Sequence, residues 1–358
     1  MDKWISKKIG CVLRESGADK ILLFNTGTRD PNFLYVTGFN SGLFEGTFTL
    51  VDEYKITVFA SPLEYEDAKR MSKGQIEVIK VGGSSELSSA LEKEVKGSIL
   101  GVDGDFLPYK RYISMKNRLK PKKMVDASAA FLNARIIKSE PEVRSIGKAA
   151  SITKEAMRMI EGILKAGITE REIASSFDSI SCSIGSEEPS FKTIVCFGKN
   201  AAMPHHSPDS TRLKKGDLVL IDAGAKVGNY CSDITRTILF GIQKKSKKSE
   251  MHEIVEEAQS LAIKAIKPGA TGKDIHAISA NHINTSAKGA YNGTFIHSLG
   301  HQIGIEVHDG GLGLSPTSDL KLKEGMVVSV EPGIYLPGSG GVRIEDDILV
   351  TRKGARIL

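Results

Sequence analysis

The sequence predicts an α/β domain followed by an α+β domain. The chain has 358 residues, which is too long for one ordinary hydrophobic core. Strand-like and helix-like segments alternate through the first third of the chain, as in α/β domains. Beyond this region, long amphipathic helices are followed by runs of strands. We therefore expect domains at residues 1–130 and 135–358, with a linker around residues 126–135.

The first domain is expected to contain at least five strands and two helices. The strands are short runs of β-branched and aromatic residues. They lie at residues 20–26, 47–52, 55–61, 76–81 and 98–105. Amphipathic patterns at residues 62–72 and 84–95 predict helices. This alternation favours a sheet covered by helices.

The second domain begins with two helices whose starts are marked in the sequence. Ser139 is a suitable N-cap with Pro141 in the first turn, and Gly167 follows the end of the pattern. Thr169 and Glu172 have the spacing of a capping box.

Strands, helices and more strands come next in this domain. We expect strands at residues 191–198, 217–226 and 231–241, then a loop followed by a helix within residues 244–269 and a second helix at 271–289. Strands at 326–337 and 341–351 complete the domain. The order suggests that the domain consists of two similar halves.

Composition excludes several classes of protein. With 40% hydrophobic and 26% charged residues, the chain is typical of a globular protein. A net charge of +6, spread over scattered lysines, does not predict nucleic-acid binding, and the lysine cluster at residues 244–248 is most simply a solvated loop. No uncharged apolar run is long enough for a membrane span. The four cysteines form no C-x-x-C pair, which favours free thiols and a cytoplasmic location.

Several acids stand at the ends of apolar, strand-like runs. Asp222, Asp233, Glu331 and Glu345 have this placement, and His301 lies in another apolar segment. No Lys or Arg stands beside Asp222 in the sequence. Individually, such residues are usually caps, solvated turn residues or members of salt bridges. Together they supply the oxygen and nitrogen donors that two divalent cations need, and two such ions can lower the pKa of a water between them.

These residues carry a resemblance to a known family. The four acids and His301 lie in the sequence motifs "DAGAKVGNYCSDITRT", "GHQIGIEVHD" and "VEPGIYLPGSGGVRIEDD". The motif "MPHHSP" lies upstream of them. Together these motifs resemble those of the pita-bread metallopeptidases, the family of methionine aminopeptidase, aminopeptidase P and prolidase. The word "NFLYVTGF" in the first domain is similar to the Xaa-Pro branch. The resemblance implies a creatinase/prolidase-like N-terminal domain and a pita-bread catalytic domain.

The resemblance also implies a metal site. Asp233 and Glu345 would bridge two divalent ions (Mn, Co, Fe or Zn). Asp222 would bind one ion, and His301 and Glu331 would bind the other. Glu331 would in addition accept the proton of the attacking water and pass it to the leaving amine.

Three further residues have implied roles around the substrate. His205 would bind the substrate or the tetrahedral intermediate, with His206 as a neighbour. His308 would hydrogen-bond the substrate carbonyl. Arg343 would face the substrate carboxylate or steady Glu345.

Two departures from the family's words are expected to matter little for the metals. Gln302 stands where the family often has glycine, which bears on substrate size, and Asp309 stands where it often has glutamate.

The implied activity is hydrolysis of the peptide bond before proline. A prolidase acting on dipeptides is the first expectation, and an Xaa-Pro aminopeptidase acting on longer peptides is the alternative. A non-catalytic pita-bread binding module is a further alternative, which the intact ligand set disfavours. The family also implies small proline-containing peptides as substrates and a homodimer in which the N-terminal domain rims the partner's active site. We expect no nucleic-acid or membrane partner.

Overall fold

The computed structural model describes residues 3–27 and 30–358, and side chains from residue 7 onward. Two compact units, Met1–Arg135 and Ile136–Leu358, divide the chain. Each unit has its own hydrophobic core, and each is described by itself. None of the helices in the described ranges is long and apolar enough to cross a membrane.

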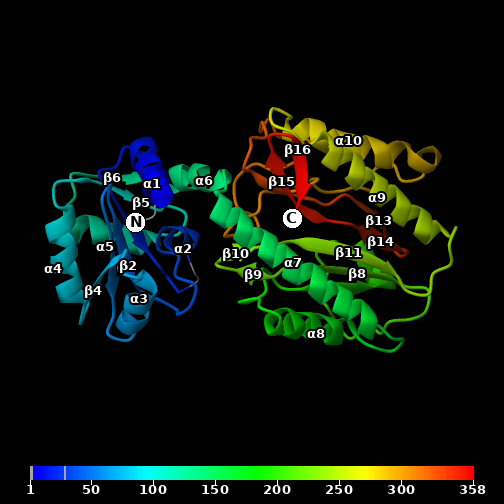
Figure 1. The fold of residues 1–358 in the computed structure, drawn as a ribbon, viewed down its shortest axis with the longest axis horizontal. Coiled ribbons are helices and arrows are strands. Elements are labelled where there is room, and N and C mark those ends of the chain that lie inside the picture. Colours follow the sequence, from blue (N-terminus) through cyan, green and yellow to red (C-terminus); the bar gives the residue numbers. More distant parts are fainter. Residues whose placement is uncertain (1–2, 28–29) are drawn as a thin grey trace. The chain divides into compact units, whose positions relative to one another are not determined.

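The first unit is a mixed six-stranded sheet with helices around it (Figure 1). Its spatial order is β4-β3-β2-β1-β5-β6, with β2 antiparallel to β1 and β3 and the remaining pairs parallel. The strands are β1 Lys20–Phe24, β2 Phe48–Val51, β3 Ile56–Ala60, β4 Glu77–Lys80, β5 Ile99–Val102 and β6 Lys123–Asp126. The helices are α1 Lys3–Ser16, α2 Pro31–Thr37, α3 Tyr65–Ser72, α4 Ser84–Val95, α5 Tyr109–Leu119 and α6 Ser128–Ile136.

The expected linker is one point where the structure differs from the sequence prediction. Residues 128–136 form helix α6 rather than irregular chain. Small residues and Phe131 on α6 pack into the first unit, where Phe131 is 1% exposed, and the boundary between the units falls at the end of this helix. Burial of an apolar helix face therefore outweighs the basic, linker-like composition that precedes it.

The second unit repeats one arrangement twice, a helix pair followed by strands. Its helices are α7 Glu140–Ile163, α8 Glu170–Ser183, α9 Lys247–Ala265 and α10 Gly272–Thr285, with short 3-10 helices η1 Gly198–Ala202 and η2 Ser286–Gly289. The strands of the first half are β7 Ile194–Phe197, β8 Leu218–Ala223, β9 Lys226–Val227, β10 Tyr230–Cys231 and β11 Ile234–Leu239. Those of the second half are β12 Val327–Val330, β13 Gly333–Leu336, β14 Gly340–Arg343, β15 Asp346–Thr351 and β16 Gly354–Ile357. The expected order of helices and strands is confirmed.

Local sequence signals start the helices where they were predicted. Ser139 and Thr169 each accept a hydrogen bond from the third helical residue, and Glu142 and Glu172 complete the two capping boxes. The lysine cluster is only partly a loop, because Ser246 caps α9 and the helix begins at Lys247.

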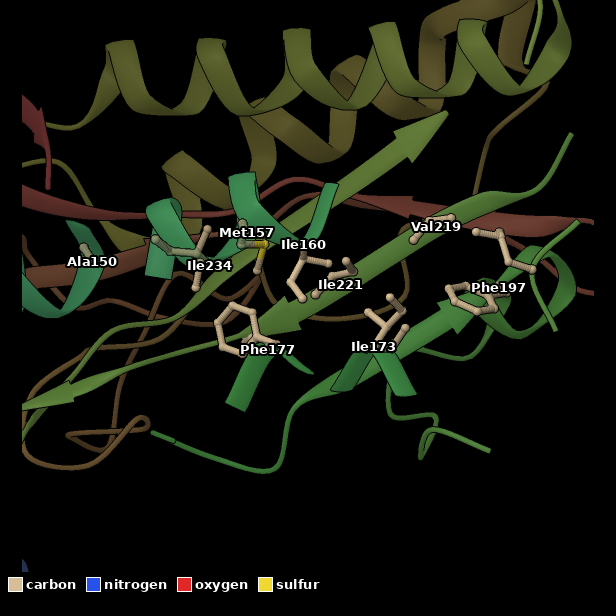
Figure 2. Close-up of a cluster of buried hydrophobic side chains, with 13 residues drawn as sticks. Ala150, Met157, Ile160, Ile173, Phe177, Phe197, Val219, Ile221 and Ile234 are labelled. Atoms are coloured by element: carbon tan, nitrogen blue, oxygen red, sulfur yellow. The ribbon is translucent and has the colours of Figure 1, made fainter. Parts of the chain in front are cut away.

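Each helix pair covers its own strands. Side chains of α7 and α8 pack against β7, β8 and β11 in one core (Figure 2). Another core lies between α9, α10, β12 and β15. These apolar contacts bury the helix-facing side of strand β8, and Asp222 lies near the end of this strand.

Candidate active site

Two acids are positioned by the pairing of β8 with β11. The strands are antiparallel, and Asp222 lies opposite Thr235. Asp233 directly precedes β11, and its backbone N–H donates to the carboxylate of Asp347 at 3.1 Å. Both Asp222 and Asp233 are buried. The apolar residues around them belong to the helix-covered core, so the strand alternation turns these carboxylates to the other face.

His301 and Glu331 are held by the edge of β12. Gly300 and Gln302 form bridges with Leu314 and Val328 on either side of the histidine. The Ser329 hydroxyl accepts from the His301 N–H at 3.0 Å and donates to Glu331 Oε1 at 3.3 Å. A single serine therefore connects the histidine and glutamate segments.

Glycine allows this close backbone packing beside His301. A Cβ atom at Gly300 would lie 2.0 Å from the Ser329 carbonyl oxygen, and one at Gly313 would lie 2.3 Å from the Gly300 carbonyl oxygen. A larger residue at either position would displace the backbone that carries the histidine.

The five predicted ligands lie together in one cleft of about 570 Å³. His301 Nε2 is 3.4 Å from Asp233 Oδ2 and 3.5 Å from Glu331 Oε1. Donor atoms of Asp233, His301 and Glu345 all lie within 4.8 Å of one another, and Asp222 lines the same cleft. The fold thus gathers five residues from separate places along the second unit into one cleft.

Burial dominates the electrostatics of this cluster. It raises the pKa of Asp233 and of Glu345 well above the usual range, and neighbouring carboxylates add to both effects. Burial likewise raises the pKa of Glu331 to about 8, and it lowers the pKa of His301 to about 4. Carboxylates crowded in this way repel one another unless cations or protons neutralise them.

The donor set fits divalent metal ions. Asp222 Oδ1, Asp233 Oδ1 and Glu345 Oε1 are buried and have no hydrogen-bond partner among the described residues. Unpartnered buried carboxylate oxygens are costly, and hard divalent cations prefer such oxygens together with an imidazole.

Asp222, which has no basic neighbour in the sequence, has a basic partner in the fold, Arg343. Its Nη2 donates to Asp222 Oδ2 at 2.5 Å across 121 residues of sequence. Nε donates to the Thr235 hydroxyl, and Nη1 donates to the Tyr335 hydroxyl. Glu345 is reached only indirectly, because the Thr235 hydroxyl donates to Glu345 Oε2 at 2.6 Å. Tyr335 was not identified from the sequence, where no motif distinguishes it.

Three histidines surround the carboxylates in the cleft, namely His205, His297 and His308. The ring of His308 stacks on that of His301 with centroids 3.9 Å apart. His297 Nε2 lies 2.8 Å from the Tyr335 hydroxyl. Burial lowers the pKa of His297 to about 4, and burial followed by the proximity of His205 lowers the pKa of His308.

Gln302, which the sequence linked to substrate size, is not among the residues that line the cleft. Its side chain is 1% exposed, and Nε2 donates to the Leu312 carbonyl at 2.9 Å. The amide therefore holds the glycine-rich segment 310–313, which itself lines the cleft.

A buried cluster of carboxylates around one histidine, in a cleft flanked by further histidines, is typical of a metal-dependent hydrolase. Comparison with known proteins gives the family. The sequence model described as metallopeptidase family M24 matches residues 144–352, and that of the creatinase/prolidase N-terminal domain matches residues 7–137.

Individual relatives match over nearly the whole chain. An Xaa-Pro dipeptidase from Pyrococcus horikoshii is 38% identical over 353 residues, covering 98% of this chain and 95% of that protein. The solved structure of an Xaa-Pro dipeptidase from Bacillus anthracis has a TM-score of 0.87 at 32% identity, covering 99% and 97% of the two chains. That of an X-Pro aminopeptidase from Thermotoga maritima has a TM-score of 0.87 at 30% identity, covering 97% and 96%.

The chain therefore belongs to metallopeptidase family M24. It is a prolidase-like enzyme with a creatinase-type N-terminal domain and a pita-bread catalytic domain, as the sequence predicted. Membership of this family implies divalent metal ions as cofactors.

Proposed function

We propose that this enzyme hydrolyses the peptide bond preceding proline, with dipeptides as its first substrates and longer Xaa-Pro peptides as the alternative. The observation that carries the proposal is the joining of all five predicted ligands in one cleft beside His205 and His308. The printed names of the relatives, Xaa-Pro dipeptidase and X-Pro aminopeptidase, support both the bond and the alternative.

Asp222, Asp233, His301, Glu331 and Glu345 would hold two divalent ions in this cleft. When bound, such ions supply a water nucleophile at neutral pH and polarise the scissile carbonyl. Mn, Co, Fe and Zn all suit this donor set.

The side chains around the ligands are proposed to handle protons and charge. Glu331, which lines the cleft beside the other proposed ligands, would accept the proton of the attacking water and transfer it to the leaving amine. His205 and His308 line the cleft and donate hydrogen bonds to the substrate carbonyl oxygen as negative charge develops on it. Arg343, fixed by three hydrogen bonds, orients Asp222 beside the substrate.

Apolar residues in the same cleft offer a surface for the proline ring. Phe191, Ile194 and Val307 line it together with the histidines. A pyrrolidine ring buries apolar area and carries no amide N–H, so an apolar wall favours it over a polar residue.

The proposal extends to assembly and location. We expect a homodimer whose N-terminal domains rim the active sites. A cytoplasmic location suits the four free cysteines, two of which are buried. Light scattering combined with an activity assay tests the assembly, and a fully active monomer would contradict it.

The decisive experiment uses metal-stripped enzyme. Adding Mn(II) or Co(II) should restore cleavage of Ala-Pro, and the rate with Ala-Pro-Ala separates dipeptidase from aminopeptidase. Absence of cleavage with either peptide and either metal would refute the proposed activity.

His205→Ala tests the role of the histidine in the same assay. Losing one donor to a developing oxyanion typically costs about 2.7–4 kcal/mol of transition-state stabilisation, so kcat should fall by about two to three orders of magnitude. Metal content and melting temperature should stay close to those of the wild type. A near-normal kcat would remove His205 from the mechanism.

A further inference from the structure

A second buried carboxylate, outside the ligand cluster, organises the loop that carries His205. Glu170 is the first residue of α8 and is 0% exposed. Its Oε1 accepts from the Phe197 N–H at 2.7 Å and from Asn200 Nδ2 at 2.9 Å. Its Oε2 accepts from His206 Nε2 at 2.8 Å and from the Asp209 N–H at 3.0 Å.

These four hydrogen bonds fix the chain on both sides of His205. Phe197 ends β7, and Asn200 lies in η1 just before the histidine loop. His206 and Asp209 lie after His205 in the same loop. One carboxylate therefore determines where this loop enters and leaves the wall of the cleft.

The histidine itself sits at the corner of a β-turn. The His206 N–H donates to the Met203 carbonyl at 3.1 Å, which places Pro204 and His205 at the two central positions. Proline is favoured at the first of these positions because its φ is preset. His205 lines the cleft. His206 is the last residue of the turn, and the hydrogen bond of its ring to Glu170 fixes this end of the turn.

Glu170, His206 and Asp209 also lie close enough together to suggest a metal site. The hydrogen bonds argue against this assignment, because each oxygen of Glu170 already has two donors. His206 Nε2 must itself carry the proton that Oε2 accepts, so its lone pair is not available to a cation.

We propose that Glu170 and His206 are positioning residues for His205. This inference rests on the role proposed above for His205. The His206–Glu170 hydrogen bond sets the orientation of the turn and hence the distance of the His205 imidazole from the reacting carbonyl. A misplacement of about 1 Å can cost about a hundredfold in rate, which is enough to make such an anchor matter.

His206→Ala removes the anchor and leaves Glu170 with three of its four donors, so the variant is expected to fold. In the Mn(II)-loaded enzyme with Ala-Pro, kcat should fall by about tenfold or more, while KM and metal content change little. His206→Gln retains a side-chain N–H that can reach Glu170 and should recover most of kcat.

A matched control comes from another histidine–glutamate pair of the second unit. His282 Nε2 lies 3.1 Å from Glu257 Oε2, and neither residue lines the cleft. His282→Ala should leave kcat unchanged. Equal losses in His206→Ala and His282→Ala would show a general stability effect and would overturn the inference.

A double-mutant cycle with His205→Ala gives the deciding measurement. If His206 acts through His205, adding His206→Ala to the His205→Ala variant should produce no further loss of kcat. The same fold-loss in both backgrounds would overturn the inference while leaving the proposed function intact. A near-normal kcat of His205→Ala alone would refute the role of His205 itself, and the positioning role with it.

Discussion

Asp30 makes the stability of the N-terminal unit depend on pH. It caps α2, with Oδ1 accepting from the Asn32 N–H at 2.8 Å and the Phe33 N–H at 3.3 Å. The residue is 1% exposed, and Oδ2 has no hydrogen-bond partner among the described residues. Burial, followed by the charge of Asp103, raises the pKa of Asp30 from 3.8 to about 7.

The raised pKa of Asp30 makes the N-terminal unit more stable at low pH than at high pH. Because the folded pKa is above the unfolded one, the folded state is favoured most at low pH, where Asp30 is protonated in both states. That advantage is lost as the pH rises through about 7. Between the unfolded pKa of 3.8 and the folded pKa of about 7, the contribution of Asp30 to the unfolding free energy falls by about 1.36 kcal/mol per pH unit. The total loss is on the order of 4 kcal/mol.

Asp30→Asn should remove this dependence. Asparagine caps helices as well as aspartate does, and its amide has no charge to bury. The chain's only tryptophan, Trp4, belongs to this unit, so urea unfolding can be followed by its fluorescence between pH 4 and pH 8. Across this range the wild-type unfolding free energy should fall relative to that of Asp30→Asn.

A matched variant controls for the loss of a charge alone. Asp52 Oδ1 also accepts two backbone hydrogen bonds, from Tyr54 and Lys55, but in an exposed turn. Asp52→Asn should keep the wild-type pH dependence. Parallel pH curves for the wild type and Asp30→Asn would refute the reasoning.

Two further predictions concern the ligand cluster. Asp233→Asn should abolish activity and lower metal content, because a ligand shared by two ions serves both; full activity with two metals per chain, measured by elemental analysis, would contradict the assignment. Arg343→Met should lower the unfolding free energy of the second unit by about 3–5 kcal/mol in chelator, since it leaves Asp222 buried without its partner. The loss of unfolding free energy should be smaller with Mn(II), because a cation can then neutralise Asp222. Unfolding is monitored by circular dichroism, and an equal loss with chelator and with Mn(II) would exclude a link between Arg343 and the cation.

The parts of the fold that were predictable depend on neighbouring residues. Ser139 and Thr169 start their helices through bonds to residues three positions away, so their spacing is visible in the sequence. The β8 and β11 strands were equally visible as apolar, β-branched runs. The proposed ligands within and beside these strands were predicted because the short motifs that contain them resemble those of a family.

The parts that were not predictable depend on distant residues. Nothing near Asp222 shows that Arg343 will neutralise it, because the pairing requires the two halves of the second unit to close. Glu170 resembles an ordinary acid in a helical first turn, and only the folded chain brings four donors to it. Helix α6 was taken for a linker because the residues that bury its face lie elsewhere in the sequence.

The ion pair between Asp222 and Arg343 has a consequence for biosynthesis. The two residues are 121 positions apart, and a ribosome adds about 5–20 residues per second. For several seconds or longer, a nascent chain therefore carries Asp222 and Asp233 without Arg343 or Glu345, the last of the proposed ligands, while all residues of the N-terminal unit have already been synthesised. Asp222 can be neutralised by Arg343 only after strand β14 has been synthesised, so the proposed metal site can be completed only after that point.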